Sequence, residues 1–172
     1  MRAVGVSNFG PGHLAGLKAA GRELPEANQV ELSCWLQQRP LVEFCAREGI
    51  VVMAYSPLAK TWRFKKTPVA ALAEQTGRTE AQLALRWSLE AGLVTIPNST
   101  NRGRIAENAA VFDFAFDAGQ RATMAAADEG FNTTKGYNLQ NMPSDEIMMN
   151  TPAPGYMDRY PRHELDPRYG RE

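Results

Sequence analysis

Short apolar segments alternate with helical patterns four times along the first 130 residues of this chain. The apolar segments span residues 2–6, 27–32, 50–55 and 93–96. Residues 50–55 are apolar or aromatic at every position, which is typical of a strand buried on both faces of a parallel sheet. Four successive strand–helix units predict a parallel α/β sheet with right-handed crossovers. Periodicity alone leaves open whether this sheet is an open doubly wound sheet or half of a closed barrel.

The segments between the strands carry recognisable helix boundaries. Thr79 and Gln82 have the spacing of a capping box at a helix start, and Gly49 suits a helix end. His13 is expected to be a solvated side chain on the first helix. We expect helices over residues 11–20, 39–48, 68–76, from 80 onward, over 102–110 and from 118 to about 128.

Length and composition exclude several classes of protein. The 172 residues suffice for one domain with a real core, but a complete eight-stranded α/β barrel typically needs about 250. Lys and Arg number 19, as do Asp and Glu, so no basic field attracts nucleic acid or an anionic membrane. Cys34 and Cys45 lack the spacing of a disulfide framework or a metal site. With no leader sequence or membrane span in evidence, we expect a cytoplasmic protein without a metal.

Residues 96–108 have the chemistry of a phosphate site. A strand ends on a proline, and a small polar loop then opens a helix with arginines in its first turns. The free N–H groups and positive dipole end of a helix N-terminus suit a phosphate. Ser99 and Thr100 add hydroxyl donors, and Arg104 adds a planar cation that can grip the phosphate or stack on a purine.

This segment resembles the end of the aldo-keto reductase barrel, where a run of the type Ile-Pro-Lys-Ser-Thr-x-x-x-Arg-Ile-x-x-Asn holds the adenosine phosphate of NADPH. Further matching segments follow the family's order and lie at residues 5–9, 27–31, 37–45, 54–58 and 81–87. The resemblance implies that residues 1–130 are the C-terminal half of a TIM (β/α)8 barrel, built from four parallel β/α units. Residues 131–172 form a second region, predicted to be an irregular or disordered tail.

The resemblance also implies a nicotinamide site at the C-terminal ends of the strands. Ser7 and Asn8 match the pair that hydrogen-bonds the carboxamide, with Gln29 as a third partner. Tyr55 matches the tyrosine on which the nicotinamide ring stacks. The residues alone leave two alternatives, namely that Ser7 or Asn8 caps the next helix and that Tyr55 is a core aromatic. The loop after Tyr55 matches the family's pyrophosphate loop and contains Ser56, Pro57 and Leu58.

The adenosine end of the cofactor is expected at the helix that follows the last strand. By resemblance, Arg104 lies at the 2′-phosphate, while Glu107 and Asn108 bond the adenine edge. The alternative is an ordinary solvated helix face. The family commonly has lysine at the position of Asn98, so we expect NADP as the cofactor with a weakened preference over NAD. The residues assigned to this end are Asn98, Ser99, Thr100, Arg104, Glu107 and Asn108.

Members of this family reduce carbonyl compounds with a hydride from nicotinamide, while a tyrosine tuned by lysine, aspartate and histidine supplies the proton. In the family these four residues precede the Gly-Val-Ser-Asn-Phe strand, so no catalytic residue is expected in this sequence. We therefore expect a truncated NAD(P)H-dependent aldehyde or ketone oxidoreductase that keeps its cofactor site. The alternatives are a half-barrel completed by a partner chain or a second copy, and a non-catalytic nucleotide-binding or interaction module.

A half-barrel has a specific physical consequence. Closing a barrel removes the edges of a sheet, so the strands near residues 2–6 and 93–96 are expected to be unpaired edges. Apolar side chains of the barrel interior should also be uncovered, which favours self-association. We expect these interior side chains to include Val4, Val6, Val52 and Ile96.

Overall fold

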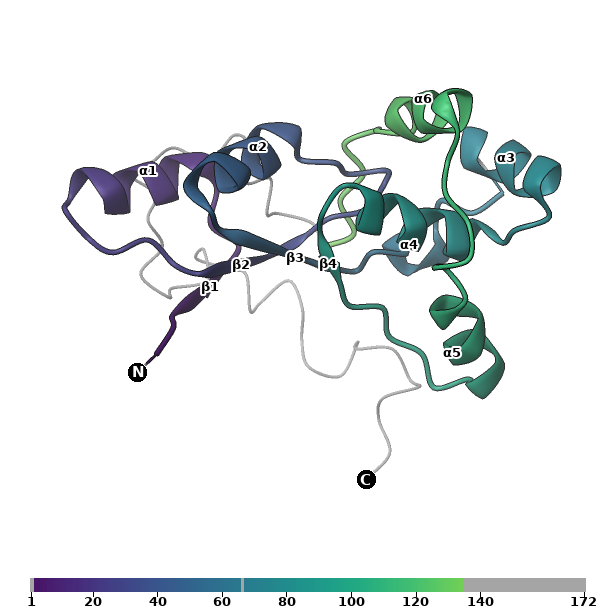
Figure 1. The fold of residues 1–172 in the computed structure, drawn as a ribbon, viewed down its shortest axis with the longest axis horizontal. Coiled ribbons are helices and arrows are strands. Elements are labelled where there is room, and N and C mark those ends of the chain that lie inside the picture. The colour runs from purple at the N-terminus through teal and green to yellow at the C-terminus, as the bar shows by residue number, and fades with distance from the viewer. Residues whose placement is uncertain (1, 66, 135–172) are drawn as a thin grey trace, which may run out of the picture. The chain divides into compact units, whose positions relative to one another are not determined.

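The computed structural model describes residues 2–65 and 67–134, and these contain one parallel sheet. The strands lie side by side in chain order, so that β1 and β4 form the two edges (Figure 1). Every pairing is parallel, as the strand–helix alternation predicted. The strands are β1 (Gly5–Ser7), β2 (Ala27–Glu31), β3 (Val51–Tyr55) and β4 (Val94–Thr95).

Helices follow the strands with the capping groups that the sequence indicated. Thr79 Oγ1 accepts a hydrogen bond from the Gln82 N–H and forms the predicted capping box, and Gly49 ends its helix with φ of 72°. The helices are α1 (Pro11–Ala19), α2 (Arg39–Glu48), α3 (Pro68–Thr76), α4 (Glu80–Glu90), α5 (Arg102–Ala109) and α6 (Ala118–Ala126), with a short 3-10 turn, η1 (Ala59–Thr61).

Helices α1 and α2, with Trp87 of α4, cover one face of the sheet. Alternate residues of β3 differ sharply in exposure, because Val52 is 5% exposed whereas Val51 is 48% exposed. Figure 1 shows α1 and α2 on the same side of the strands, and side chains from both helices contribute to the core there. The buried residues of this core are Leu14, Val30, Leu32, Leu41, Cys45, Ile50, Val52, Ala54 and Leu93.

The opposite face of the sheet carries the exposed apolar side chains. Met53 pairs with Val94, so these two residues share a face with Val51. Val51, Val94 and Ile96 are exposed, as expected of interior positions in a half-barrel. The assignment of Val6 and Val52 to this face was wrong. Both pack into the core beneath the helices, because side chains alternate along a strand and theirs have the helix-facing parity.

A second apolar cluster joins α3, α4 and α6. It contains Trp35, Val69, Leu83 and Met124, all fully buried. The backbone N–H of Phe131 donates to the Trp35 carbonyl, so the segment after α6 is tied to this cluster. Among the residues that the structure describes, no helix is long and apolar enough to cross a membrane. The tail predicted over 131–172 lies outside the described residues except for 131–134.

Candidate functional site

The structure brings together the residues expected to hold the nicotinamide end. Ser7 Oγ and the Asn8 N–H both donate to the Gln29 carbonyl oxygen, each at 2.9 Å. The Tyr55 hydroxyl donates to Asn8 Oδ1 at 3.2 Å. Three separate strand ends therefore meet at one rim of the sheet, which is where ligands bind in parallel α/β folds.

Neither Ser7 nor Asn8 caps α1, so that alternative is wrong. The N-cap residue is Gly10, and its N–H donates to His13 Nδ1 at 2.9 Å. His13 is only 6% exposed and packs against the Phe9 ring, so the expectation of a solvated histidine was also wrong. Asn8 itself has φ of 59°, a left-handed conformation in which asparagine is enriched.

Tyr55 lies at the end of β3 on the uncovered face of the sheet. It is paired with Glu31 of the neighbouring strand and has the same parity as the exposed Val51. The side chain is half-buried and does not belong to either apolar core cluster. Tyr55 therefore places an aromatic ring beside the ends of β1 and β3.

The loop after Tyr55 has an unusual backbone. Ser56 has φ of 50° and accepts the Ala59 N–H at its carbonyl, and Ala59, Lys60 and Thr61 also have positive φ. Residues with side chains rarely adopt this conformation, and such strained positions cluster at ligand-binding sites. Pro57 is buried within the loop and Leu58 packs against the second core cluster.

Some polar groups of the loop from β4 to α5 form hydrogen bonds within the loop and to the start of α5. Ser99 Oγ accepts the Asn101 N–H at 3.2 Å, and Asn101 Oδ1 caps α5 by accepting the Arg104 N–H at 3.0 Å. The Arg104 side chain is exposed and makes no hydrogen bond or ion pair within residues 2–65 and 67–134. Asn98 and Thr100 are exposed in the same loop. A helix start with a free guanidinium can accept an anion.

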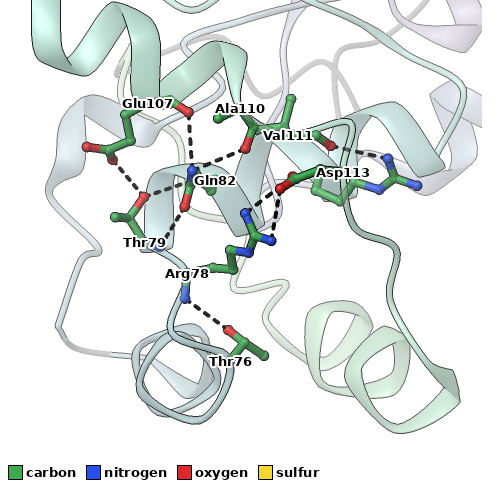
Figure 2. Close-up of polar contacts among 9 residues, drawn as sticks. Thr76, Arg78, Thr79, Gln82, Glu107, Ala110, Val111 and Asp113 are labelled. Carbon is green, nitrogen blue, oxygen red and sulfur yellow. Dashed lines mark hydrogen bonds and ion pairs between the residues drawn. The ribbon is translucent and has the colours of Figure 1, made fainter.

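Two residues expected at the adenine edge lie near the end of α5. Glu107 Oε1 accepts the Thr79 hydroxyl at 2.6 Å, so one carboxylate oxygen faces the start of α4 (Figure 2). Asn108 is half-buried. No contact described in the structure joins this end to the Ser7–Asn8–Tyr55 group. The two ends are linked through the sheet, where the Ile96 N–H donates to the Ala54 carbonyl beside Tyr55.

Glu31 is a residue of this rim that the sequence analysis did not single out. Its side chain is 4% exposed, and its carboxylate accepts the N–H and hydroxyl groups of Thr133 and Thr134. Four donors satisfy a carboxylate buried at the end of β2. The available signal was a charged residue at the end of a predicted strand, but its partners lie about a hundred residues further along the chain.

The titratable groups outside this rim have structural roles. Burial raises the pKa of the Cys34 thiol well above its usual value, and burial also raises that of Cys45, so neither is a reactive thiolate. Partial desolvation opposes ionisation of Glu90, but hydrogen bonds from the Phe116 N–H, Arg86 and Arg121 outweigh it. The pKa of Glu90 therefore lies below its usual value.

The rim residues are suited to binding rather than to proton transfer. Ser7, Asn8 and Gln29 offer both donors and acceptors, which an amide ligand requires. Tyr55 offers an aromatic face. The arrangement can therefore hold and orient an aromatic amide, with an anion at the start of α5.

Comparisons with known proteins agree with this arrangement. The sequence model of the Aldo/keto reductase family matches residues 1–129. A curated relative, the 9,11-endoperoxide prostaglandin H2 reductase of Trypanosoma cruzi, is 44% identical over 117 residues, which are 66% of this chain and 41% of that protein. The chain thus spans less than half the length of that relative.

Solved structures show the same relation. An aldo-keto reductase from a Medee basin deep-sea metagenome library has a TM-score of 0.71 at 33% identity, with 76% of this chain and 49% of that chain covered. A Bombyx mori aldo-keto reductase in complex with NADP has a TM-score of 0.69 at 31% identity, with 83% and 50% covered. The four parallel units correspond to about half of each of these proteins.

Proposed function

Because this chain belongs to the aldo/keto reductase family, we propose that it is the cofactor-binding half of an NADPH-dependent oxidoreductase acting on small aldehydes or ketones. Aldo/keto reductases are TIM-barrel enzymes, and the four β/α units here supply half of such a barrel. A cytoplasmic location belongs to the same proposal.

The contact between Tyr55 and Asn8 is the observation that carries the proposal. It joins the Tyr55 hydroxyl to the Asn8 amide, and Ser7 beside Asn8 donates its hydroxyl to the Gln29 carbonyl. In this proposal the ring of the nicotinamide stacks on Tyr55, while Ser7, Asn8 and Gln29 bond its carboxamide. The cofactor supplies the hydride, and these residues bind it and fix which face of its ring is presented to the substrate.

The adenosine end of the cofactor lies at α5 in this proposal. The 2′-phosphate is received by the Arg104 guanidinium, which has no partner within the described segments, and by the polar loop of Asn98, Ser99 and Thr100. Glu107 and Asn108 face the adenine. The pyrophosphate lies between the two ends at Ser56, Pro57 and Leu58.

The chain as given holds the cofactor without turning over substrate, because the family's acid and its partners precede the matched segments. A second arrangement is favoured by one observation, the exposed inner face at Val51, Val94 and Ile96. In that arrangement a partner chain, including a second copy of this one, covers the face and completes the barrel.

Titration calorimetry with NADPH on two Tyr55 variants tests the proposal. Tyr55→Phe keeps the ring and loses the bond to Asn8, so its Kd should rise only about threefold. Tyr55→Ala also loses the stacking surface, and its Kd should rise roughly 10- to 100-fold. Circular dichroism checks that both variants stay folded. NADPH binding to Tyr55→Ala with unchanged affinity would remove the main support of the proposal.

A further inference from the structure

Helix α5 carries Arg104, Glu107 and Asn108 of the expected adenosine end, yet it has no buried side chain. Helices of globular proteins are usually held in place by an apolar face that packs against the core. Arg102–Ala109 lacks such an anchor, and its one large apolar residue, Ile105, is 51% exposed. Other contacts must therefore set the position of α5.

Polar contacts from the start of α4 supply this anchor (Figure 2). Gln82 Nε2 donates to the Ala110 carbonyl at 3.1 Å and to the Glu107 carbonyl at 3.4 Å, so it binds two carbonyls at the C-terminal end of α5. Thr79 Oγ1 donates to the Glu107 carboxylate at 2.6 Å. Both anchoring side chains are themselves fixed, because they are the two members of the α4 capping box.

The chain immediately after α5 is held by two arginines from the same region. Arg78 makes a paired hydrogen bond to Asp113, at 3.2 and 3.1 Å, and Arg86 Nη1 donates to the Val111 carbonyl at 3.2 Å. These contacts restrain the segment that leaves α5, but they do not touch the helix itself. Gln82 is the residue that joins the two parts, since it binds both the last turn of α5 and the first residue beyond it.

We propose that Gln82 is a positioning residue for the adenosine end of the cofactor, acting through α5 without touching the ligand. Its amide oxygen accepts the Thr79 N–H at 3.1 Å and caps α4, while its amide nitrogen fixes α5. This proposal rests on the proposed cofactor site, because a fixed α5 matters only if Arg104 and Glu107 must contact the same ligand.

Gln82→Glu separates the two roles of this side chain. A glutamate at residue 82 can still accept the Thr79 N–H, but it has no N–H to donate to α5. Gln120→Glu is the matched control. Gln120 has the same place in the capping box of α6, where its amide oxygen accepts the Asp117 N–H at 3.0 Å, and its amide nitrogen makes no hydrogen bond in the described segments. Gln82→Met removes the donor without adding a charge. Weaker ligand binding by this variant therefore cannot come from repulsion between a new negative charge and the phosphate.

Two measurements on the 172-residue chain decide the matter. Amide hydrogen exchange of residues 102–109 should be about tenfold faster in Gln82→Glu and Gln82→Met, and within twofold of wild type in Gln120→Glu. The Kd for adenosine 2′,5′-bisphosphate, which lacks the nicotinamide end, should rise about fivefold in both Gln82 variants. As a control, saturation-transfer NMR measures binding of reduced nicotinamide mononucleotide, which should stay unchanged in both Gln82 variants. A variant that is merely unfolded would instead lose both ligands.

The outcomes separate this inference from the proposed function. If wild type does not bind the bisphosphate, the proposed cofactor site is wrong, and the exchange experiment still shows whether Gln82 holds α5. If wild type binds it and Gln82→Met binds equally well, Gln82 is not a positioning residue. Equal acceleration of exchange in Gln82→Glu and Gln120→Glu would also overturn the inference.

Discussion

Asn98 is the residue at which this chain departs most clearly from the phosphate-binding run of its family. Lysine commonly occupies this position, whereas Asn98 is an exposed neutral side chain. The remaining cation of the expected site is Arg104, which has no partner among the described residues. A charged hydrogen bond to phosphate contributes about 1.5–3 kcal/mol, so we expect its absence to reduce discrimination between NADPH and NADH.

Asn98→Lys should restore that discrimination. We expect the Kd for NADPH to fall about tenfold and the Kd for NADH to change little, because only NADPH carries the 2′-phosphate. Gln75→Lys adds the same charge at an exposed position of α3 and controls for the overall field of the protein. An equal fall in the Kd values of NADPH and NADH would show that Asn98 is not at the phosphate.

Individual residues also show which contacts could be predicted from the sequence and which could not. Ser7, Asn8, Gln29 and Tyr55 could be named in advance because their motifs lie at strand ends, and the structure brings these strand ends together. The contact of Glu107 with Thr79 joins residues 28 positions apart, and no local pattern indicates it. His13 is buried and contacts the Gly10 N–H and the Phe9 ring, which a helical periodicity cannot reveal.

At the scale of the elements, the strand spacing predicted the sheet but not the direction of every side chain. The order and parallel pairing follow from strand–helix alternation, because crossovers of this kind are right-handed and join neighbours. Residues 50–55 are apolar throughout, so the sequence contains no alternation that separates the helix side from the other face. That distinction exists only after the helices have packed, and Val52 was misassigned for this reason.

Val51 and Val52 provide a matched test of the two faces. Val52→Ala removes buried methyl groups and should lower the free energy of unfolding by roughly 1–3 kcal/mol. Val51→Ala changes a side chain that is 48% exposed and should cost less than about 0.5 kcal/mol. Urea denaturation measures both. Equal losses would mean that the inner face is covered in solution.

Glu90 ties the end of α4 to the segment before α6. Its carboxylate binds Arg86, Arg121 and the Phe116 N–H. The pKa of Glu90 is lowered on folding, so the ionised carboxylate stabilises the folded state above its unfolded pKa. This contribution is lost as the pH falls through the folded pKa.

Glu90→Gln should therefore destabilise the chain by about 1 kcal/mol at pH 7, and the difference from wild type should shrink towards pH 3. Urea midpoints at the two pH values measure this. Glu74→Gln is the control, since Glu74 is an exposed α3 side chain without a hydrogen bond or ion pair in the described segments. A difference between Glu90→Gln and wild type that is independent of pH would contradict the assignment.

At the scale of the whole molecule, the sheet formed by the described residues has two edge strands and a face with exposed apolar side chains. β1 and β4 are the edges, and Val51, Val94 and Ile96 are exposed on the face without helices. Unpaired edges and apolar patches favour association. The part of the relatives that this chain does not match would supply the covering layer.

Light scattering should therefore show concentration-dependent association of the 172-residue chain. The double change Val51→Lys and Val94→Lys should reduce it, because two charges on the inner face oppose its burial. Phe112→Lys is the control, since Phe112 is 76% exposed but lies outside the sheet. Association that responds to Phe112 and not to the two valines would place the contact elsewhere.

We expect the ends of the four strands and the start of α5 to form one cofactor site. Amide hydrogen exchange with and without saturating NADPH tests this expectation. We predict slower exchange in residues 7–9, 29–31, 55–58 and 98–108, with little change in α3 and α6. Protection confined to helices away from these strand ends, or no protection anywhere, would contradict this expectation.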